Sequence, residues 1–178
     1  AGLRIDEVIA HWYKKSPWKE TEECSKQAIE NQIVDRVIEL VIAEGEALPG
    51  VPDIFDFFKE QHIPMAVASS SKYKIIDAVL KKLDIQGYFE LVYSAEDEPY
   101  GKPHPGIFIT TAAKLTVEPT DCIVFEDSFN GILAGLSARM HVIAIPEGVN
   151  YTHPKFDIAT KKLKSLLEFD LLCLNELI

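Results

Sequence analysis

Apolar residues in the first quarter of the chain recur every three or four positions. Residues 5–14 follow this spacing and predict an amphipathic helix. After a break at Pro17, Thr21 is expected to cap a second helix, whose apolar face continues to about Glu44. No alternating pattern of the kind that β-strands show occurs in this segment, so residues 1–46 are predicted to form a small helical unit.

The pattern changes after Gly50, where short apolar runs alternate with amphipathic stretches. The predicted strands are 63–68, 89–93, 122–125, 142–145 and a short edge strand near 161–164, and the predicted helices are 51–61, 75–83, 105–115, 129–138 and one at the C-terminus. Nearly continuous apolar strands that alternate with helices indicate a parallel sheet covered on both faces. We therefore expect an α/β fold, with residues 47–178 as its core domain.

Polar residues follow three of the predicted strands. The carboxyl ends of parallel strands meet at one edge of a sheet, where ligands bind, so these residues are expected to converge. They are Ser69, Ser70, Ser71 and Lys72 after the first strand, Lys102 after the second, and Glu126, Asp127 and Ser128 after the third.

These residue types suit a phosphate and a metal ion. Serine hydroxyls and free N–H groups at a helix start bind anions, Lys102 adds a cation, and carboxylates such as Glu126 and Asp127 suit Mg²⁺. Simpler alternatives exist: Ser70 or Ser71 could cap the helix that follows the first strand, Asp127 could cap a later helix, and Lys102 could be a solvated surface lysine. Because the net charge is −10, a phosphate site would need this local positive charge.

Composition narrows the class of protein. A chain with a net charge of −10 and no basic stripe is a poor binder of nucleic acid or of an anionic membrane. No apolar run approaches the ~20 residues of a membrane span. Three widely spaced cysteines, Cys24, Cys122 and Cys173, form neither a disulfide framework nor a zinc site. We expect a cytoplasmic monomer.

Three motifs carry a family resemblance. In chain order they are Val67-Ala68-Ser69, Gly101-Lys102-Pro103 and Val124-Phe125-Glu126-Asp127-Ser128. They resemble the second, third and fourth motifs of the haloacid dehalogenase superfamily, in the forms found in its β-phosphoglucomutase-like branch. Gly2-Leu3-Arg4-Ile5-Asp6 and Ser94-Ala95-Glu96 are similar to the bacterial 2-deoxyglucose-6-phosphate (hexitol phosphate) phosphatases, and the resemblance covers essentially the whole chain.

The resemblance implies a Rossmann-like parallel core with a helical cap, and a role for each matched residue. Ser69, with the N–H of Ser70, would hold the transferring phosphate, and Lys102 would neutralise phosphate and nucleophile. Glu126 and Asp127 would bind Mg²⁺, Asp127 most directly. Ser71 and Lys72 would face the distal part of the substrate. Arg4 lies in the cap segment that reads the substrate, although it could also be a solvated arginine.

One family motif is absent from the sequence. The first motif, Asp-x-Asp-Gly, supplies the nucleophile and the general acid/base on the first, central strand, and it does not occur in residues 1–178. The resemblance therefore implies that this chain is inactive alone, because phosphoryl transfer through an aspartyl phosphate has no nucleophile here. We expect an incomplete record of a longer chain, with a gap between the strands that end at Ser69 and Glu126.

The implied function is a Mg²⁺-dependent phosphatase that acts on a small phosphorylated sugar or sugar alcohol. A β-phosphoglucomutase is the first alternative, but Tyr73 stands where that branch often has Asn, which argues against a second phosphate site. A non-catalytic phosphate-binding or interaction module that has lost its first motif is the second alternative.

Overall fold

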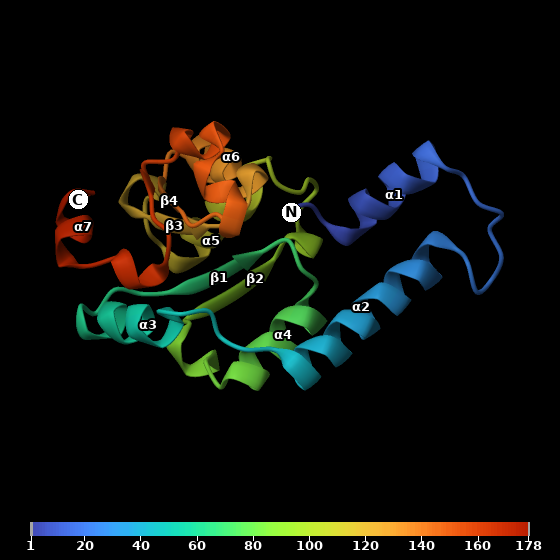
Figure 1. Cartoon of the computed structure of the whole chain (residues 1–178), viewed down its shortest axis with the longest axis horizontal. Helices are drawn as coiled ribbons and strands as arrows, with labels where there is room; N and C mark the ends of the chain where they lie inside the picture. Colours follow the sequence, from blue (N-terminus) through green and yellow to red (C-terminus); the bar gives the residue numbers. More distant parts are fainter. Residues whose placement is uncertain (1, 178) are drawn as a thin grey trace.

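Two helices precede alternating strands and helices in the computed structural model, which describes residues 2–177 (Figure 1). The elements are α1 (Ile5–Lys15), α2 (Lys26–Glu44), α3 (Val51–Glu60), β1 (Ala66–Ser69), α4 (Tyr73–Leu83), β2 (Leu91–Ser94), α5 (Gly106–Leu115), β3 (Ile123–Glu126), α6 (Phe129–Ser137), β4 (His141–Ala144), β5 (Lys161–Lys162) and α7 (Leu171–Asn175). Every expected helix and strand is present, with ends that differ by a few residues.

The start of α2 differs from the sequence prediction. Ser25 caps this helix, since its hydroxyl accepts a hydrogen bond from the N–H of Ala28 at 3.2 Å. The Thr21 hydroxyl instead accepts from the N–H of Cys24 at 3.2 Å within the preceding loop. The prediction of Thr21 as the cap was therefore wrong. Thr21 and Ser25 are both good capping residues, and the loop continues past Thr21, so that α2 begins after Ser25.

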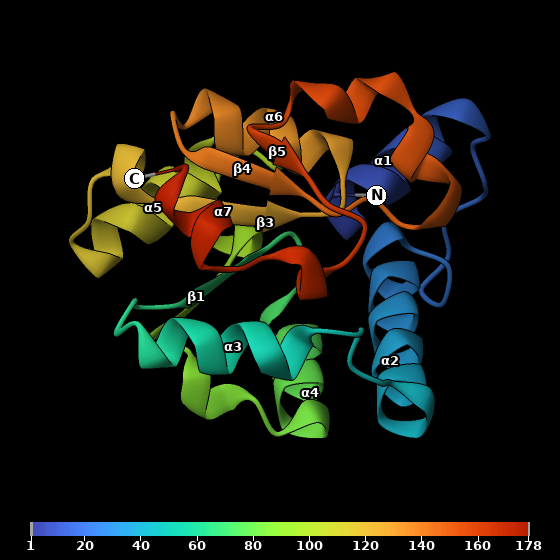
Figure 2. The same ribbon diagram turned by 60° about the vertical axis from the view of Figure 1, so that its left-hand side comes forward.

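The parallel sheet is divided into two parts. β1 pairs with β2, and β3, β4 and β5 form a separate three-stranded sheet in that order. In Figure 2 β1 lies below β3, and no described strand lies between them. Residues of both strands border a largely apolar cavity of about 570 Å³. The gap expected between the strands that end at Ser69 and Glu126 is therefore present.

Side chains of the three-stranded sheet alternate between two apolar clusters. Val124 and Val142 pack with helices α5 and α6, whereas Phe125 and Ile143 pack with α3 and α7 on the other face. The geometry of a β-strand explains this arrangement, because successive residues along a strand point to opposite faces of the sheet. The expected coverage on both faces is confirmed.

The two N-terminal helices extend away from the sheets (Figure 1). α1 contacts α2, and α2 packs along α4. The segment before α1 returns to the carboxyl ends of the strands, where the Ser70 hydroxyl donates to the carbonyl of Gly2 at 3.0 Å. The start of α1 is thereby attached to the edge of the sheet at which the polar residues gather. Within residues 2–177, none of the helices has the length and apolar character that a bilayer span requires.

Candidate functional site

A cavity of about 300 Å³ lies at the carboxyl ends of β1 and β3. It is lined by residues 2–3, 68–71, 102 and 125–128. The structure therefore brings together six of the predicted site residues, namely Ser69, Ser70, Ser71, Lys102, Glu126 and Asp127. Arg4 and Lys72 do not belong to this lining and lie at the junction with the N-terminal helices.

The serine loop, residues 69–71, faces this cavity instead of capping the next helix. α4 is preceded by Lys72, which makes no side-chain capping bond. The Ser69 hydroxyl accepts from the N–H of Ser71 at 3.1 Å, and the fully buried Ser94 donates its hydroxyl to the carbonyl of Ser71 at 2.7 Å. These bonds hold the loop in one shape, so the capping alternative for Ser70 does not apply. Ser94 was not predicted as a site residue.

Lys102 is buried at the centre of the site, with only 6% of its surface exposed. Its ammonium forms an ion pair with Glu126 and donates to the carbonyl of Ala68 at 3.3 Å. It also lies 4.6 Å from the centre of the Phe108 ring. The alternative of a solvated surface lysine is thus wrong, and the positive charge has a fixed position.

Glu126 uses both carboxylate oxygens within the protein. Oε1 accepts from Lys102, and Oε2 accepts from the N–H of Ser128 at 3.3 Å and from its hydroxyl at 3.0 Å. A side chain at Gly131 would overlap this carboxylate, so glycine is needed there. In this structure Glu126 holds Lys102 and leaves Asp127 as the carboxylate open to a ligand.

Asp127 is exposed at the rim of the cavity. Its carboxylate makes no hydrogen bond or ion pair within residues 2–177, because Ser128, not Asp127, caps α6 by accepting from the N–H of Gly131 at 3.0 Å. Mg²⁺ is often held by one or two carboxylates together with substrate phosphate and water. The part of the chain that the structure describes holds no cluster of three potential metal ligands. Asp127 is an exposed carboxylate of the cavity lining that a Mg²⁺ ion could reach together with water or phosphate oxygens.

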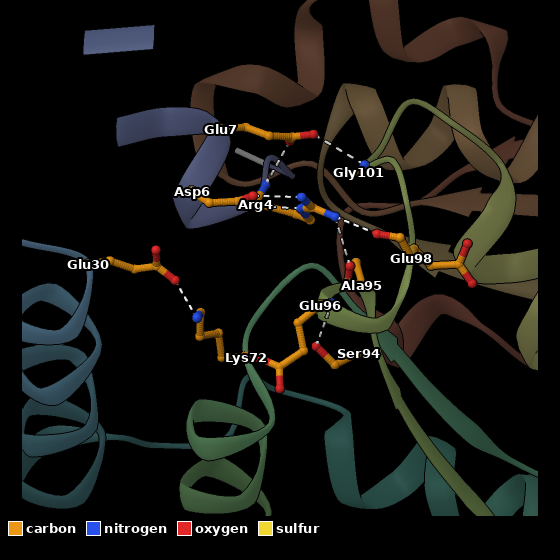
Figure 3. Close-up of polar contacts among 10 residues, drawn as sticks. All are labelled: Arg4, Asp6, Glu7, Glu30, Lys72, Ser94, Ala95, Glu96, Glu98 and Gly101. Atoms are coloured by element: carbon orange, nitrogen blue, oxygen red, sulfur yellow. Dashed lines mark hydrogen bonds and ion pairs between the residues drawn. The ribbon is translucent and has the colours of Figure 1, made fainter. Parts of the chain in front are cut away.

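Arg4 and Lys72 bind protein groups at the junction of the core with α1 and α2 (Figure 3). Arg4 forms an ion pair with Asp6 at 2.6 Å and donates to the carbonyls of Ala95 at 3.2 Å and Glu98 at 2.6 Å. The hydrogen bond that Arg4 donates to the Asp6 carboxylate raises the pKa of Arg4. Lys72 pairs with Glu30 of α2, and that hydrogen bond raises the pKa of Lys72.

Two glutamates at this junction were missed by the sequence reasoning. Glu7 accepts from the N–H of Gly101 at 3.2 Å and from that of Arg4 at 3.2 Å (Figure 3). Glu30 is only 7% exposed, although charged residues are rarely buried unless they are paired. The sequence offered one indication that Glu30 is buried. It lies four residues before the apolar Val34, and therefore on the same face of α2.

Comparison with protein families gives one match over most of the chain. Residues 4–139 match the model of the haloacid dehalogenase-like hydrolases. Hexitol phosphatase B of Escherichia coli is 39% identical over 167 residues, which cover 94% of this chain and 74% of that protein. Fructose-1-phosphate phosphatase of the same organism is 32% identical over 66% of this chain and 62% of its own length.

Solved structures show the same fold. CbbY of Rhodobacter sphaeroides, determined in complex with phosphate, matches with a TM-score of 0.85 and 25% identity over 97% of this chain and 78% of its own. A β-phosphoglucomutase of Clostridium difficile matches with a TM-score of 0.79 and 27% identity over 99% of this chain and 77% of its own. The α/β architecture expected from the sequence is therefore confirmed.

Proposed function

The chain belongs to the haloacid dehalogenase-like hydrolases. From this premise we propose that it provides the substrate-binding residues of a Mg²⁺-dependent phosphatase that acts on small phosphorylated sugars or sugar alcohols. The similarity to hexitol phosphatase B supports this substrate class. The observation that carries the proposal is a single cavity that joins the serine loop, the buried Lys102 and the open Asp127.

Each of these groups has one task in the proposal. The Ser69 hydroxyl and the N–H groups of the serine loop bind phosphoryl oxygens. Lys102 neutralises the charge on the phosphoryl group, and its burial strengthens this interaction because little water screens it. Asp127 would hold Mg²⁺, which when bound neutralises charge on the phosphoryl oxygens. Glu126 keeps the ammonium of Lys102 in place.

The chain's own residues bind the substrate but do not attack it. The family's nucleophile motif, Asp-x-Asp-Gly, is absent from the sequence, and transfer of a phosphoryl group to the enzyme needs a nucleophile. We therefore expect the 178-residue chain to bind a sugar phosphate without releasing phosphate from it.

Calorimetric titration of this chain with sorbitol 6-phosphate, with and without Mg²⁺, tests the proposal. We expect saturable binding that Mg²⁺ strengthens and no phosphate release in a parallel assay. Asp127→Asn should abolish the effect of Mg²⁺, whereas Asp121→Asn, an exposed aspartate before β3, should preserve it. The absence of binding, or an unchanged effect of Mg²⁺ in Asp127→Asn, would contradict the assignment.

The missing motif also favours a second candidate, a non-catalytic phosphate-binding module. The intact mass of the protein isolated from its own cells separates the two. A mass of 20.0 kDa together with sugar-phosphate binding supports the module, because no nucleophile segment is then attached. A larger mass together with phosphate release supports the phosphatase.

A β-phosphoglucomutase is the less favoured reaction. Such an enzyme must bind a bisphosphate, so it needs cations for two phosphates. Lys102 belongs to the cavity lining, whereas Arg4 and Lys72 lie outside it, at the junction with α1 and α2, where they pair with Asp6 and Glu30. Conversion of β-glucose 1-phosphate to glucose 6-phosphate would contradict this preference.

A further inference from the structure

Two cations flank the cavity on the side of the N-terminal helices. Lys72 directly follows the serine loop, and Arg4 directly follows residues 2–3, which line the same cavity. Figure 3 shows both side chains between the core and helices α1 and α2. A substrate whose phosphoryl group lies at the serine loop could extend toward these two side chains.

Both cations already have protein partners. The guanidinium of Arg4 bonds to both oxygens of Asp6 and to two backbone carbonyls. Lys72 pairs with Glu30, which is buried on α2. Asp6 and Glu96 also lie close enough to Lys72 to raise its pKa. The electrostatic surroundings of Lys72 are therefore negative, not positive.

A second phosphate at this position would meet two unfavourable effects. It would approach the carboxylates of Glu30, Asp6 and Glu96, which repel it. It would have to share the Lys72 ammonium with Glu30, whose negative charge already offsets that cation, or else separate the pair and leave a buried carboxylate without a partner, which is strongly disfavoured. An uncharged hydroxyl group meets neither penalty, since it can donate a hydrogen bond to a carboxylate.

We propose that Glu30, through its ion pair with Lys72, makes this side of the site accept the uncharged, hydroxyl-bearing end of a sugar monophosphate and reject a second phosphate. Glu30 is thus a specificity-determining residue of the site, and it acts from the helix α2 that lies outside the cavity lining. This inference rests on the proposed function, because it assumes that a sugar phosphate binds in the cavity.

The test compares glucose 6-phosphate with glucose 1,6-bisphosphate, which differ only in the second phosphate, by calorimetric titration of the full chain with Mg²⁺. The unmodified chain should bind the monophosphate more tightly. Glu30→Gln releases Lys72, so it should raise bisphosphate affinity about tenfold and change monophosphate affinity by less than about threefold. Glu39→Gln, an exposed glutamate on the same helix, should change neither affinity.

Lys72→Met separates the charge effect from a change in shape. This variant removes the same ion pair without releasing a cation, so bisphosphate affinity should not rise. An equal gain in Lys72→Met and Glu30→Gln would overturn the inference, as would tighter bisphosphate binding by the unmodified chain, a result that does not depend on any variant folding. If the unmodified chain binds neither ligand, the proposed function itself fails. Monophosphate binding with an unchanged preference in Glu30→Gln refutes only the role of Glu30.

Discussion

Lys102 joins two strands that share no backbone hydrogen bond. Its ammonium contacts the carbonyl of Ala68 in β1 and the carboxylate of Glu126 in β3, while each strand pairs only with its outer neighbour. Both charges are less than 10% exposed, so the cost of removing them from water is offset by their mutual contact, by the carbonyl of Ala68 and by Ser128. One side chain therefore lines the cavity of the candidate site and also connects the two sheets.

Loss of this ammonium should destabilise the whole chain. Lys102→Met leaves the buried Glu126 without its cation, and we expect the free energy of unfolding to fall by about 3–5 kcal/mol. Urea denaturation followed by circular dichroism measures this change. Lys74→Met, at an exposed lysine of α4, is the matched control and should change stability by less than about 0.5 kcal/mol. A similar small loss in both variants would show that the buried pair contributes little.

Tyr93 should make stability depend on pH in alkaline solution. Burial and the hydrogen bond to Glu98 raise the pKa of Tyr93 to about 12, from an ordinary value of 10.0. The folded state thus keeps the phenol neutral where the unfolded chain ionises it. The resulting stability is complete below about pH 10 and is lost as the pH rises through about 12.

Unfolding measured by urea between pH 9 and about pH 12 checks this expectation. Tyr93→Phe should flatten the decline in stability over that interval, because phenylalanine does not ionise. Tyr100→Phe, at an exposed tyrosine, should leave the decline unchanged. Identical pH profiles for the two variants would rule out Tyr93 as the cause.

At the scale of elements, α1 is attached to the segment that carries Lys102. Glu7 accepts from the N–H of Gly101, the residue before Lys102, and Arg4 bonds to the carbonyls of Ala95 and Glu98. A side chain at Gly101 would approach Glu7 Oε2 to 2.6 Å, so glycine permits this contact. The position of the first helix and that of the buried Lys102 are therefore linked.

Removal of the Glu7 carboxylate should loosen this link. In Glu7→Ala the Gly101 amide loses its acceptor, and a hydrogen bond of this kind contributes about 1 kcal/mol or more. We expect faster hydrogen exchange at Gly101 and in the first turn of α1, measured by nuclear magnetic resonance. Glu22→Ala, at an exposed glutamate in the loop before α2, serves as the control. Unchanged protection at Gly101 would argue against the link.

The elements themselves could be predicted from the sequence, but several of their contacts could not. Apolar periodicity located every helix and strand, since burial of one face imposes that spacing. It placed Ser69, Lys102 and Asp127 together because strand ends converge in a parallel sheet. Periodicity does not show which charged side chains that are distant in the sequence form ion pairs in the fold. The pairing of Glu30 with Lys72 and the attachment of Arg4 to the 95–98 turn therefore emerged only from the structure.

At the scale of the molecule, the divided sheet encloses apolar surface that no described residue fills. The cavity of about 570 Å³ between β1 and β3 is lined mainly by apolar side chains from both apolar clusters. An apolar cavity of this size forgoes packing contacts and lowers stability. It also offers a binding place for small apolar molecules.

The isolated chain should therefore bind the dye anilinonaphthalene sulfonate under native conditions. We expect a rise in dye fluorescence without denaturant, together with a low midpoint of unfolding in urea, because the packing between the two sheets is incomplete. Fluorescence and circular dichroism on the same samples measure both quantities. A well-folded chain that does not raise the fluorescence of the dye would contradict the presence of an open apolar cavity.

The division of the sheet also affects how the candidate site keeps its dimensions. The serine loop lies at the end of β1 in the two-stranded sheet, whereas Asp127 directly follows β3 of the three-stranded sheet. Their spacing is thus set by helix packing and by Lys102, not by a continuous ladder of backbone hydrogen bonds. Small rotations of one sheet against the other would widen or narrow the site, and a ligand held by both sides would act as a crosslink that stabilises one spacing of the two sheets.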